Sequence, residues 1–253
     1  MSEVVVGGEL LASGALTRGQ LRWNYRRLFP DVYAPKASPP TLRLKTAGAW
    51  LWSKRTGVVT GRAASAMHGA LWVREVGGLL VTAPHRTAFD LARHLPRDGA
   101  VTHLDALAQA TGVTAAEALS LAARYPRARG LRRARIALDL MDGGAESPKE
   151  TWLRLLLIDA GLPRPRTQIR VADRFREAFI DMGYDEPKVG LDYEGAHHST
   201  DRGQYVHDIG RAELIEGERW IDVKVVKEHS RQFILHRVRE AFARRGCTPQ
   251  TLH

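Results

Sequence analysis

The sequence predicts an α/β protein of the α+β type, in which a mainly helical, basic region precedes a core with the element order αβββαβα. Two observations predict this class. Apolar residues recur at helical spacing through most of the first 144 residues, whereas beyond them short alternating stretches typical of strands lie between three amphipathic helices. The Gly143-Gly144 pair separates the two patterns, so we expect domains at residues 1–144 and 145–253.

Composition limits the class of protein further. A chain of 253 residues with 44% hydrophobic and 26% charged residues lies in the range of globular proteins that bury a core. Cys247 is the only cysteine, so no internal disulfide can form and a reducing compartment is expected. The apolar start, Val4 to Leu16, is too short to span a bilayer and lacks the basic opening of a signal peptide. We therefore expect a cytoplasmic protein with no membrane partner.

The net charge of +10 is concentrated in the first region. Residues 1–144 contain 20 Lys and Arg against 10 Asp and Glu, whereas residues 145–253 contain 18 against 18. A positive region joined to an acid-bearing one suits a polyanionic partner such as DNA. The alternative is an Arg-rich composition that serves solubility.

The first region predicts short helices joined by turns. A helix is expected to open with Thr17 as its N-cap, and a turn and small strand follow at residues 29–34. Arg22, Arg26 and Arg27 are expected on neighbouring helical turns, where they could contact DNA. The pattern predicts further helices at residues 41–54, 61–71, 87–94, 101–109 and 114–125, and a strand at 79–82.

A run of arginines follows the last of these helices. Its members are Arg124, Arg127, Arg129, Arg132, Arg133 and Arg135, which fall within twelve residues. Such a run can contact phosphates, with an affinity that falls steeply as salt rises. It can equally be the solvated face of a helix, and both interpretations stay open.

The second region begins with a strong helix start. Ser147 is the expected N-cap, Pro148 occupies the first turn and Glu150 stands at the capping-box position. This helix is expected to end at Gly161. The remaining elements are expected as strands at 167–171, 177–182, 189–193 and 220–226 and as helices at 205–216 and 230–245.

The clearest functional signal lies in residues 179–198, where two strands are expected to pair through a turn at 185–188. Side chains alternate between the faces of a strand, so Asp192 and Glu194 share one face and the apolar residues beside them share the other. Pairing of the two strands brings Asp181 next to both acids. Three neighbouring carboxylates repel one another unless a proton or a cation intervenes. The alternative is a surface hairpin with a solvated acidic face.

Four spaced motifs occur in order in the second region. They read Glu146-Ser-Pro-Lys-Glu150-Thr, Asp181, Asp192-Tyr-Glu194-Gly-Ala-His-His198 and Asp208-Ile-Gly-Arg211. A bacterial family allied to very-short-patch-repair (Vsr) endonucleases has Glu-Ser-Pro-x-Glu-Thr, an Asp before the hairpin turn, Glu-Tyr-Asp-Gly-x-x-His and Asp-x-x-Arg. Residues 146–245 therefore resemble that family, and the resemblance implies the restriction-endonuclease-like PD-(D/E)xK fold and cleavage of DNA.

The resemblance also implies roles for individual residues. Asp181, Asp192 and Glu194 would bind Mg²⁺ or Mn²⁺, with Glu194 as a ligand or a general base. His198 would donate a proton, because imidazole titrates near neutral pH. Glu150 would either complete the site or serve only to cap its helix.

Three further residues would support the site. Asp208 and Arg211 lie three apart on one helix face, where they would form an ion pair or orient the site. The sequence departs from the family pattern in two ways: Glu-Tyr-Asp is inverted to Asp-Tyr-Glu, and the lysine of the PD-(D/E)xK motif is replaced by Glu194. Lys224, on the last expected strand, is a candidate substitute for the missing positive charge.

Residues 1–144 resemble the AbiEi-like antitoxin region that precedes such nuclease-like domains. The matching stretches are 29–33, 63–69 and 81–93. The opening helix, basic turn and strand also resemble a reduced winged-helix module. The resemblance implies a DNA-binding or regulatory role for this region.

Three classes of function follow from these observations. The leading hypothesis is a metal-dependent DNA endonuclease that acts in repair or defence. The alternative is a DNA-binding, antitoxin-type transcriptional regulator whose nuclease fold has lost activity, which the inverted motif favours. A structural or protein-interaction module is the third class, and the uneven charge disfavours it.

Overall fold

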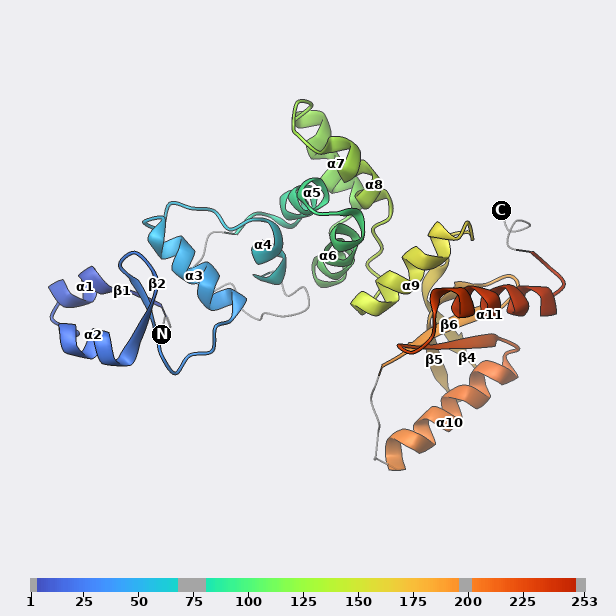
Figure 1. Ribbon diagram of the computed structural model, residues 1–253. Coiled ribbons are helices and arrows are strands. Elements are labelled where there is room, and N and C mark those ends of the chain that lie inside the picture. The colour runs from blue at the N-terminus through green and yellow to red at the C-terminus, as the bar shows by residue number, and fades with distance from the viewer. Residues whose placement is uncertain (1–3, 68–80, 196–201, 249–253) are drawn as a thin grey trace. The chain divides into compact units, whose positions relative to one another are not determined.

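Figure 1 shows the computed structural model of the protein, which describes residues 4–67, 81–195 and 202–248. The chain divides into two compact units, Met1–Met141 and Asp142–His253. The boundary expected from sequence, after residue 144, lies three residues beyond this division. Helices and two β-sheets are both present, as expected for the α+β class.

A small antiparallel sheet with three helices opens the first unit. Its elements are β1 (Val5–Val6), α1 (Gly7–Ala12), α2 (Arg18–Asn24), β2 (Tyr25–Phe29), β3 (Val32–Pro35) and α3 (Leu42–Trp52). The strands lie in the order β1-β3-β2. Thr17 caps α2 through a capping box with Gln20, as predicted. Val32 and Leu44 belong to the small core that joins the sheet to α3.

The predicted placement of three arginines on neighbouring helical turns is wrong for two of them. α2 ends at Asn24 and the chain passes directly into β2, so only Arg22 lies on the helix, while Arg26 and Arg27 lie on the strand. Arg26 is half-buried and donates from Nη2 to the carbonyl of Ser38 at 2.6 Å. Pairing with β3 decides the conformation here, because strand formation depends on tertiary partners more than on local spacing.

The rest of the first unit is helical. Its elements are α4 (Gly61–Met67), α5 (Pro84–His94), α6 (Arg97–Thr111), α7 (Ala115–Arg124) and α8 (Leu131–Asp139). The capping box predicted at Thr114 and Glu117 is present. Residues 68–71 of the helix predicted at 61–71 and residues 79–80 of the predicted strand lie outside the described residues. Val81 forms only a single bridge with Val59. Helix α8, which carries part of the arginine run, is absent from the predicted elements.

The second unit has the predicted element order in its described part. The elements are α9 (Pro148–Asp159), β4 (Arg166–Ala172), β5 (Glu177–Tyr184), β6 (Val189–Glu194), α10 (Arg202–Gly217), β7 (Ile221–Val226) and α11 (Arg231–Arg244). The strands lie in the order β4-β5-β6-β7. The first three are antiparallel neighbours, whereas β6 and β7 are parallel and are connected through α10.

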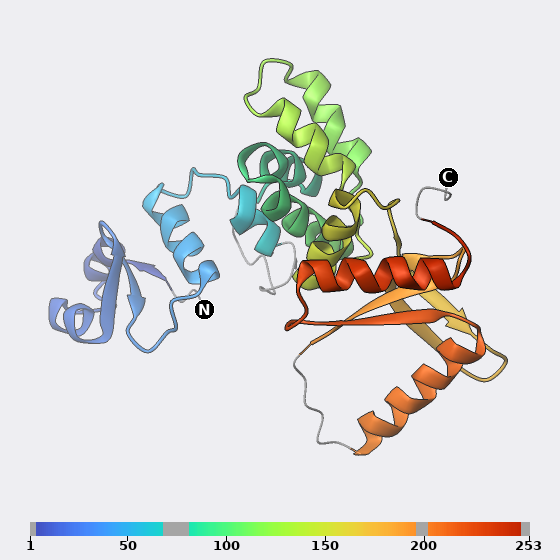
Figure 2. The same cartoon turned by 45° about the vertical axis from the view of Figure 1, so that its right-hand side comes forward.

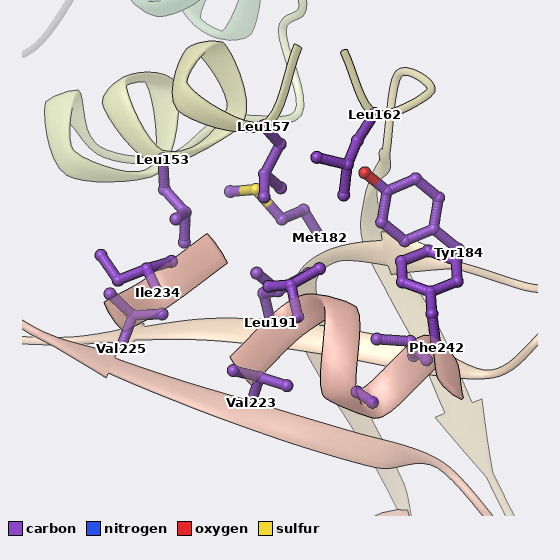
Figure 3. Close-up of a cluster of buried hydrophobic side chains, with 13 residues drawn as sticks. Leu153, Leu157, Leu162, Met182, Tyr184, Leu191, Val223, Val225, Ile234 and Phe242 are labelled. Carbon is purple, nitrogen blue, oxygen red and sulfur yellow. The ribbon is translucent and has the colours of Figure 1, made fainter. Parts of the chain in front are cut away.

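Both faces of this sheet are covered, as Figures 1 and 2 show. Helices α9 and α11 pack on one face, where Leu153 and Leu157 of α9 meet Leu191 of β6 and Phe242 of α11 (Figure 3). Helix α10 packs on the other face. Burial of a large apolar side chain stabilises the folded state by about 1.5–3 kcal/mol. If the pairing of two strands shifted by one residue, the apolar side chains of the shifted strand would turn to the other face of the sheet and lose this burial. The two cores therefore fix the register that positions the acids of β6.

No helix in the described part of the chain is long and apolar enough to cross a membrane.

Candidate functional site

Acidic side chains meet where β5 and β6 stop pairing. The ladder between these strands ends at the pair Met182 and Leu191. Beyond it, the backbone N–H of Asp181 donates to Asp192 Oδ1 at 2.9 Å, and the backbone N–H of Tyr193 donates to Asp181 Oδ2 at 2.7 Å. Each aspartate carboxylate therefore accepts a hydrogen bond from the backbone of the other strand. The two aspartates hold the strand ends together and are held by them.

Strand β5 rotates at this point. Ile180 and Met182 lie two residues apart and would share one face in a regular strand. Ile180 nevertheless packs in the core beneath α10, whereas Met182 packs in the core beneath α9 and α11. On β4, Gln168 lies between the partners of these two residues and has φ 49, a left-handed conformation that is uncommon outside glycine. The twist places Asp181 at the gap between β5 and β6.

A lysine from β7 lies among three carboxylates. Lys224 Nζ is 2.9 Å from Asp192 Oδ2, 2.9 Å from Glu194 Oε1 and 3.1 Å from Asp222 Oδ2. Asp192 is the register partner of Lys224 in the parallel pair of strands, so the two side chains stand side by side. Alternation along β6 and β7 turns Glu194 and Asp222 to the same face of the sheet, the face that α10 covers.

An arginine from α10 completes the environment of Asp192. Arg211 Nη2 lies 2.6 Å from Asp192 Oδ2 and also donates to the carbonyl of Phe179 at 2.6 Å. The Asp192 side chain is only 5% exposed, so it depends on these partners for solvation. It accepts from one backbone N–H, one guanidinium and one ammonium group. Arg211 thus reaches into the site, while Asp208, one turn earlier on α10, is exposed.

The electrostatics separate the aspartates into two groups. Burial raises the pKa of Asp181 to about 7; the Tyr193 hydrogen bond opposes this shift, and the Asp192 and Glu150 carboxylates add to it. Burial also raises the pKa of Asp222 to about 6, and the repulsion from Asp192 adds to this shift while the attraction of Lys224 opposes it. Burial would raise the pKa of Asp192 as well, but its two cationic partners outweigh burial and lower that pKa. Asp192 is therefore the most firmly ionised of the three.

Glu150 is buried at the start of α9. Its backbone N–H donates to Ser147 Oγ at 3.1 Å, which confirms the predicted N-cap. In a capping box, the Glu150 side chain would accept a hydrogen bond from the backbone N–H of the N-cap residue, Ser147. Here Glu150 Oε2 instead accepts from the backbone N–H of Glu146 at 2.8 Å. Burial raises the pKa of Glu150, and the Asp192 carboxylate adds to that shift. Glu150 thus has a structural partner and also contributes negative charge near the aspartates.

The structure brings most of the predicted site residues together. Asp181, Asp192, Glu194, Arg211 and Lys224 form one cluster. His198 lies outside the described residues.

Sequence reasoning missed one member of the cluster, Asp222. The strand around it was predicted, and the alternation of Ile221-Asp222-Val223-Lys224 places Asp222 on the same face as Lys224. The signal was therefore present in the sequence.

The arginines predicted to contact DNA are largely accessible. The exposed members of this group are Arg22, Arg27, Arg127, Arg129, Arg132, Arg133 and Arg135. On α8, Ala134, Ala137 and Leu138 are buried, whereas the three arginines of the helix are exposed. The helix therefore presents its basic side chains to solvent, an arrangement that suits both a phosphate-contacting surface and a solvated helix face.

As folded, the cluster does not fit a divalent cation. Among the described residues, no three His, Cys, Asp or Glu side chains are grouped as a metal centre requires. The Lys224 ammonium group occupies the position between Asp192, Glu194 and Asp222, and Arg211 occupies another side of Asp192.

The chain is similar to two curated proteins of Mycobacterium tuberculosis. They are the uncharacterised protein MT2308 of strain CDC 1551 / Oshkosh and the uncharacterised protein Rv2248 of strain ATCC 25618 / H37Rv. Each is 30% identical over 161 residues, which is 63% of this chain, and the chain spans 59% of the length of these relatives. No protein-family model and no solved structure matches the chain.

Proposed function

We propose that the second unit is a restriction-endonuclease-like domain that hydrolyses DNA phosphodiester bonds and uses Mg²⁺ or Mn²⁺. The observation that carries this proposal is the acid–lysine cluster, in which Asp181, Asp192, Glu194 and Lys224 meet where two central strands diverge. The element order αβββαβα supports the same interpretation. Divalent cations polarise phosphoryl oxygens and supply hydroxide near neutral pH in such enzymes.

The residues of the chain have properties that this chemistry needs. The Lys224 side chain is 39% exposed, so its ammonium group can meet a phosphate oxygen from solvent. Arg211 is 22% exposed and is held by the Phe179 carbonyl, which gives the site a second, more rigid positive charge. Asp181 is the carboxylate whose pKa lies near neutrality, at about 7, as a general base or acid requires.

Incubation of the full-length protein with supercoiled plasmid and with single-stranded DNA tests the proposal. We expect nicking or linearisation in Mg²⁺ or Mn²⁺ and none in EDTA, because the carboxylates need a hard cation to act on phosphate. The matched control is the double variant Asp181→Asn, Asp192→Asn, which keeps side-chain size and removes two charges. A wild-type protein that cleaves neither DNA in either metal contradicts the proposal.

A second candidate function is that of an antitoxin-type DNA-binding regulator whose nuclease fold has lost activity. The observation that favours it is the neutralisation of Asp192 by both Lys224 and Arg211. A permanently neutralised cluster would be a structural ion-pair network rather than a catalytic site. This candidate predicts specific DNA binding without cleavage in the same assay.

Both candidates require DNA affinity, and we expect the exposed arginines of α8 to supply part of it. The triple variant Arg132→Ala, Arg133→Ala, Arg135→Ala should weaken binding about equally for different DNA sequences. Its slope of log affinity against log salt should be shallower by about 0.9 for each phosphate that the variant no longer neutralises. Fluorescence anisotropy at several salt concentrations measures both quantities.

The matched control places alanine at exposed arginines of the second unit, Arg239 and Arg244 on α11. Alanine is the best helix former, so neither set of substitutions should disturb its helix. An unchanged salt slope in the α8 variant would show that the arginine run is only a solvated helix face.

A further inference from the structure

We propose that Lys224 is a resident counter-ion of the acid cluster and competes with divalent cations, so that a metal ion binds these carboxylates only when the lysine has withdrawn. This inference rests on the metal use proposed above and adds a regulatory element to the same site.

The first argument is the position of the ammonium group. Lys224 Nζ lies within 3.1 Å of three carboxylate oxygens, which come from Asp192 and Glu194 on β6 and from Asp222 on β7. A group of acids held on two neighbouring strands has thus already taken up a cation. The parallel register places Lys224 directly beside Asp192, so this contact is built into the sheet.

The second argument is the difference in exposure between the lysine and the acids. The Lys224 side chain is 39% exposed, whereas the side chains of Asp192 and Asp222 are 5% and 13% exposed. Lysine has a flexible four-carbon stem and a strongly hydrated head, so it can turn towards water without movement of the strand. The two aspartates would then stay where they are. The cluster can therefore lose its cation and keep its oxygen ligands.

The third argument is what remains when the lysine leaves. Asp222 Oδ1 is buried, and none of the residues that the structure describes forms a hydrogen bond with it. Arg211 still neutralises Asp192, but it lies 4.0 Å from Asp222 and is also bonded to the Phe179 carbonyl. Buried carboxylates that lack a cation repel one another, and carboxylate oxygens are the preferred ligands of Mg²⁺ and Mn²⁺.

Removal of the lysine should therefore strengthen metal binding. If the lysine is withdrawn in at most about a tenth of molecules, the apparent affinity of the wild type for Mn²⁺ is lowered at least about tenfold. The variant Lys224→Ala should bind Mn²⁺ tighter by that factor in calorimetric titrations of the full-length protein. The variant Lys227→Ala, at an exposed lysine three residues further along, is the matched control and should bind as the wild type does.

Two further variants keep the test decisive. Lys224→Met retains most of the apolar stem, so it replaces Lys224→Ala should the alanine variant fail to give a cooperative unfolding transition. Lys224→Ala combined with Asp192→Asn should lose the gain in Mn²⁺ affinity. Unchanged or weaker Mn²⁺ binding when Lys224 is removed, or a gain that survives loss of the Asp192 charge, would overturn the inference.

The outcome is separable from that of the proposed function. A gain in Mn²⁺ affinity together with a wild type that cleaves no DNA would refute the endonuclease and support the resident counter-ion. Cleavage by the wild type together with an unchanged Mn²⁺ affinity in Lys224→Ala would support the endonuclease and refute the resident counter-ion.

Discussion

Replacing Asp192 with alanine is expected to lower the rate of DNA cleavage by the full-length protein on the order of a thousandfold or more. Asp192 accepts from Lys224, from Arg211 and from the Asp181 backbone at once, so its removal takes away the group that holds the cluster together. Binding of DNA should persist or improve, because a negative charge near the phosphates is lost. Single-turnover cleavage at saturating DNA, with anisotropy for binding, separates the two effects.

A loss of fold could imitate this result, so a second variant is needed. Alanine leaves Lys224 and Arg211 without their shared carboxylate, and breaking a buried ion pair in this way costs about 3–5 kcal/mol. Asp192→Asn removes the charge but keeps an oxygen that can accept from the Asp181 N–H. Cleavage lost in both variants, with the unfolding transition of Asp192→Asn near that of the wild type, would assign the effect to chemistry. Equal rates in the wild type and both variants would place the cleaving site elsewhere.

The elements of the second unit could be predicted because each carries a complete local signal. Ser147 and Pro148 mark the start of α9, and alternation of apolar residues marks β4 to β7. The pairing of β6 with β7 could not be predicted in the same way. It depends on contacts made through α10, and no local pattern sets the register of two strands separated by a helix.

This difference explains which parts of the candidate site could be predicted. A tight turn joins the strands that carry Asp181 and Asp192, so the predicted hairpin already places these two residues side by side. Alternation along β7 places Lys224 and Asp222 on one face, but their contacts with Asp192 depend on the parallel register of β6 and β7. The twist at Asp181 depends on where the ladder ends, and so do the hydrogen bonds that the Asp192 and Asp181 carboxylates accept from the backbone N–H groups of Asp181 and Tyr193. The spacing of residues in the sequence does not predict these features.

In the first unit, local signals were weaker and misled at two places. The spacing of Arg22, Arg26 and Arg27 suits a helix, but strand pairing with β3 prevails after Asn24. Helix α8 was missed because its exposed side is a run of arginines, and only three of its residues are buried. The apolar residues Ala134, Ala137 and Leu138 nevertheless recur at helical spacing, so the signal was present, and a helix face was one of the two interpretations of the arginine run.

The charge of Asp181 should make the second unit less stable as pH rises. Its pKa is raised to about 7 in the folded protein, whereas an aspartate in an unfolded chain titrates near 3.9. The folded state therefore binds the proton more tightly, and stability falls as pH rises from about 4 to about 7, then stays at the lower level. Asp181→Asn lacks this charge and can still accept the Tyr193 hydrogen bond. The variant should be more stable than the wild type above pH 7, by on the order of 2 kcal/mol after allowance for solvent screening.

The difference between variant and wild type should shrink as pH falls through about 7 and vanish below about 4, where the wild-type carboxyl is protonated in both states. Hydrogen exchange of β5 and β6 amides, measured across this range in EDTA, reports on the second unit and not on the first. Asp185→Asn is the matched control, because it removes an exposed carboxylate from the turn after β5 without touching the cluster. A stability difference that is the same at pH 4 and pH 8 would show that ionisation of Asp181 carries no cost in the folded protein. That result would mean that the attraction of Arg211, which already opposes the rise in the pKa of Asp181, outweighs the effect of burial.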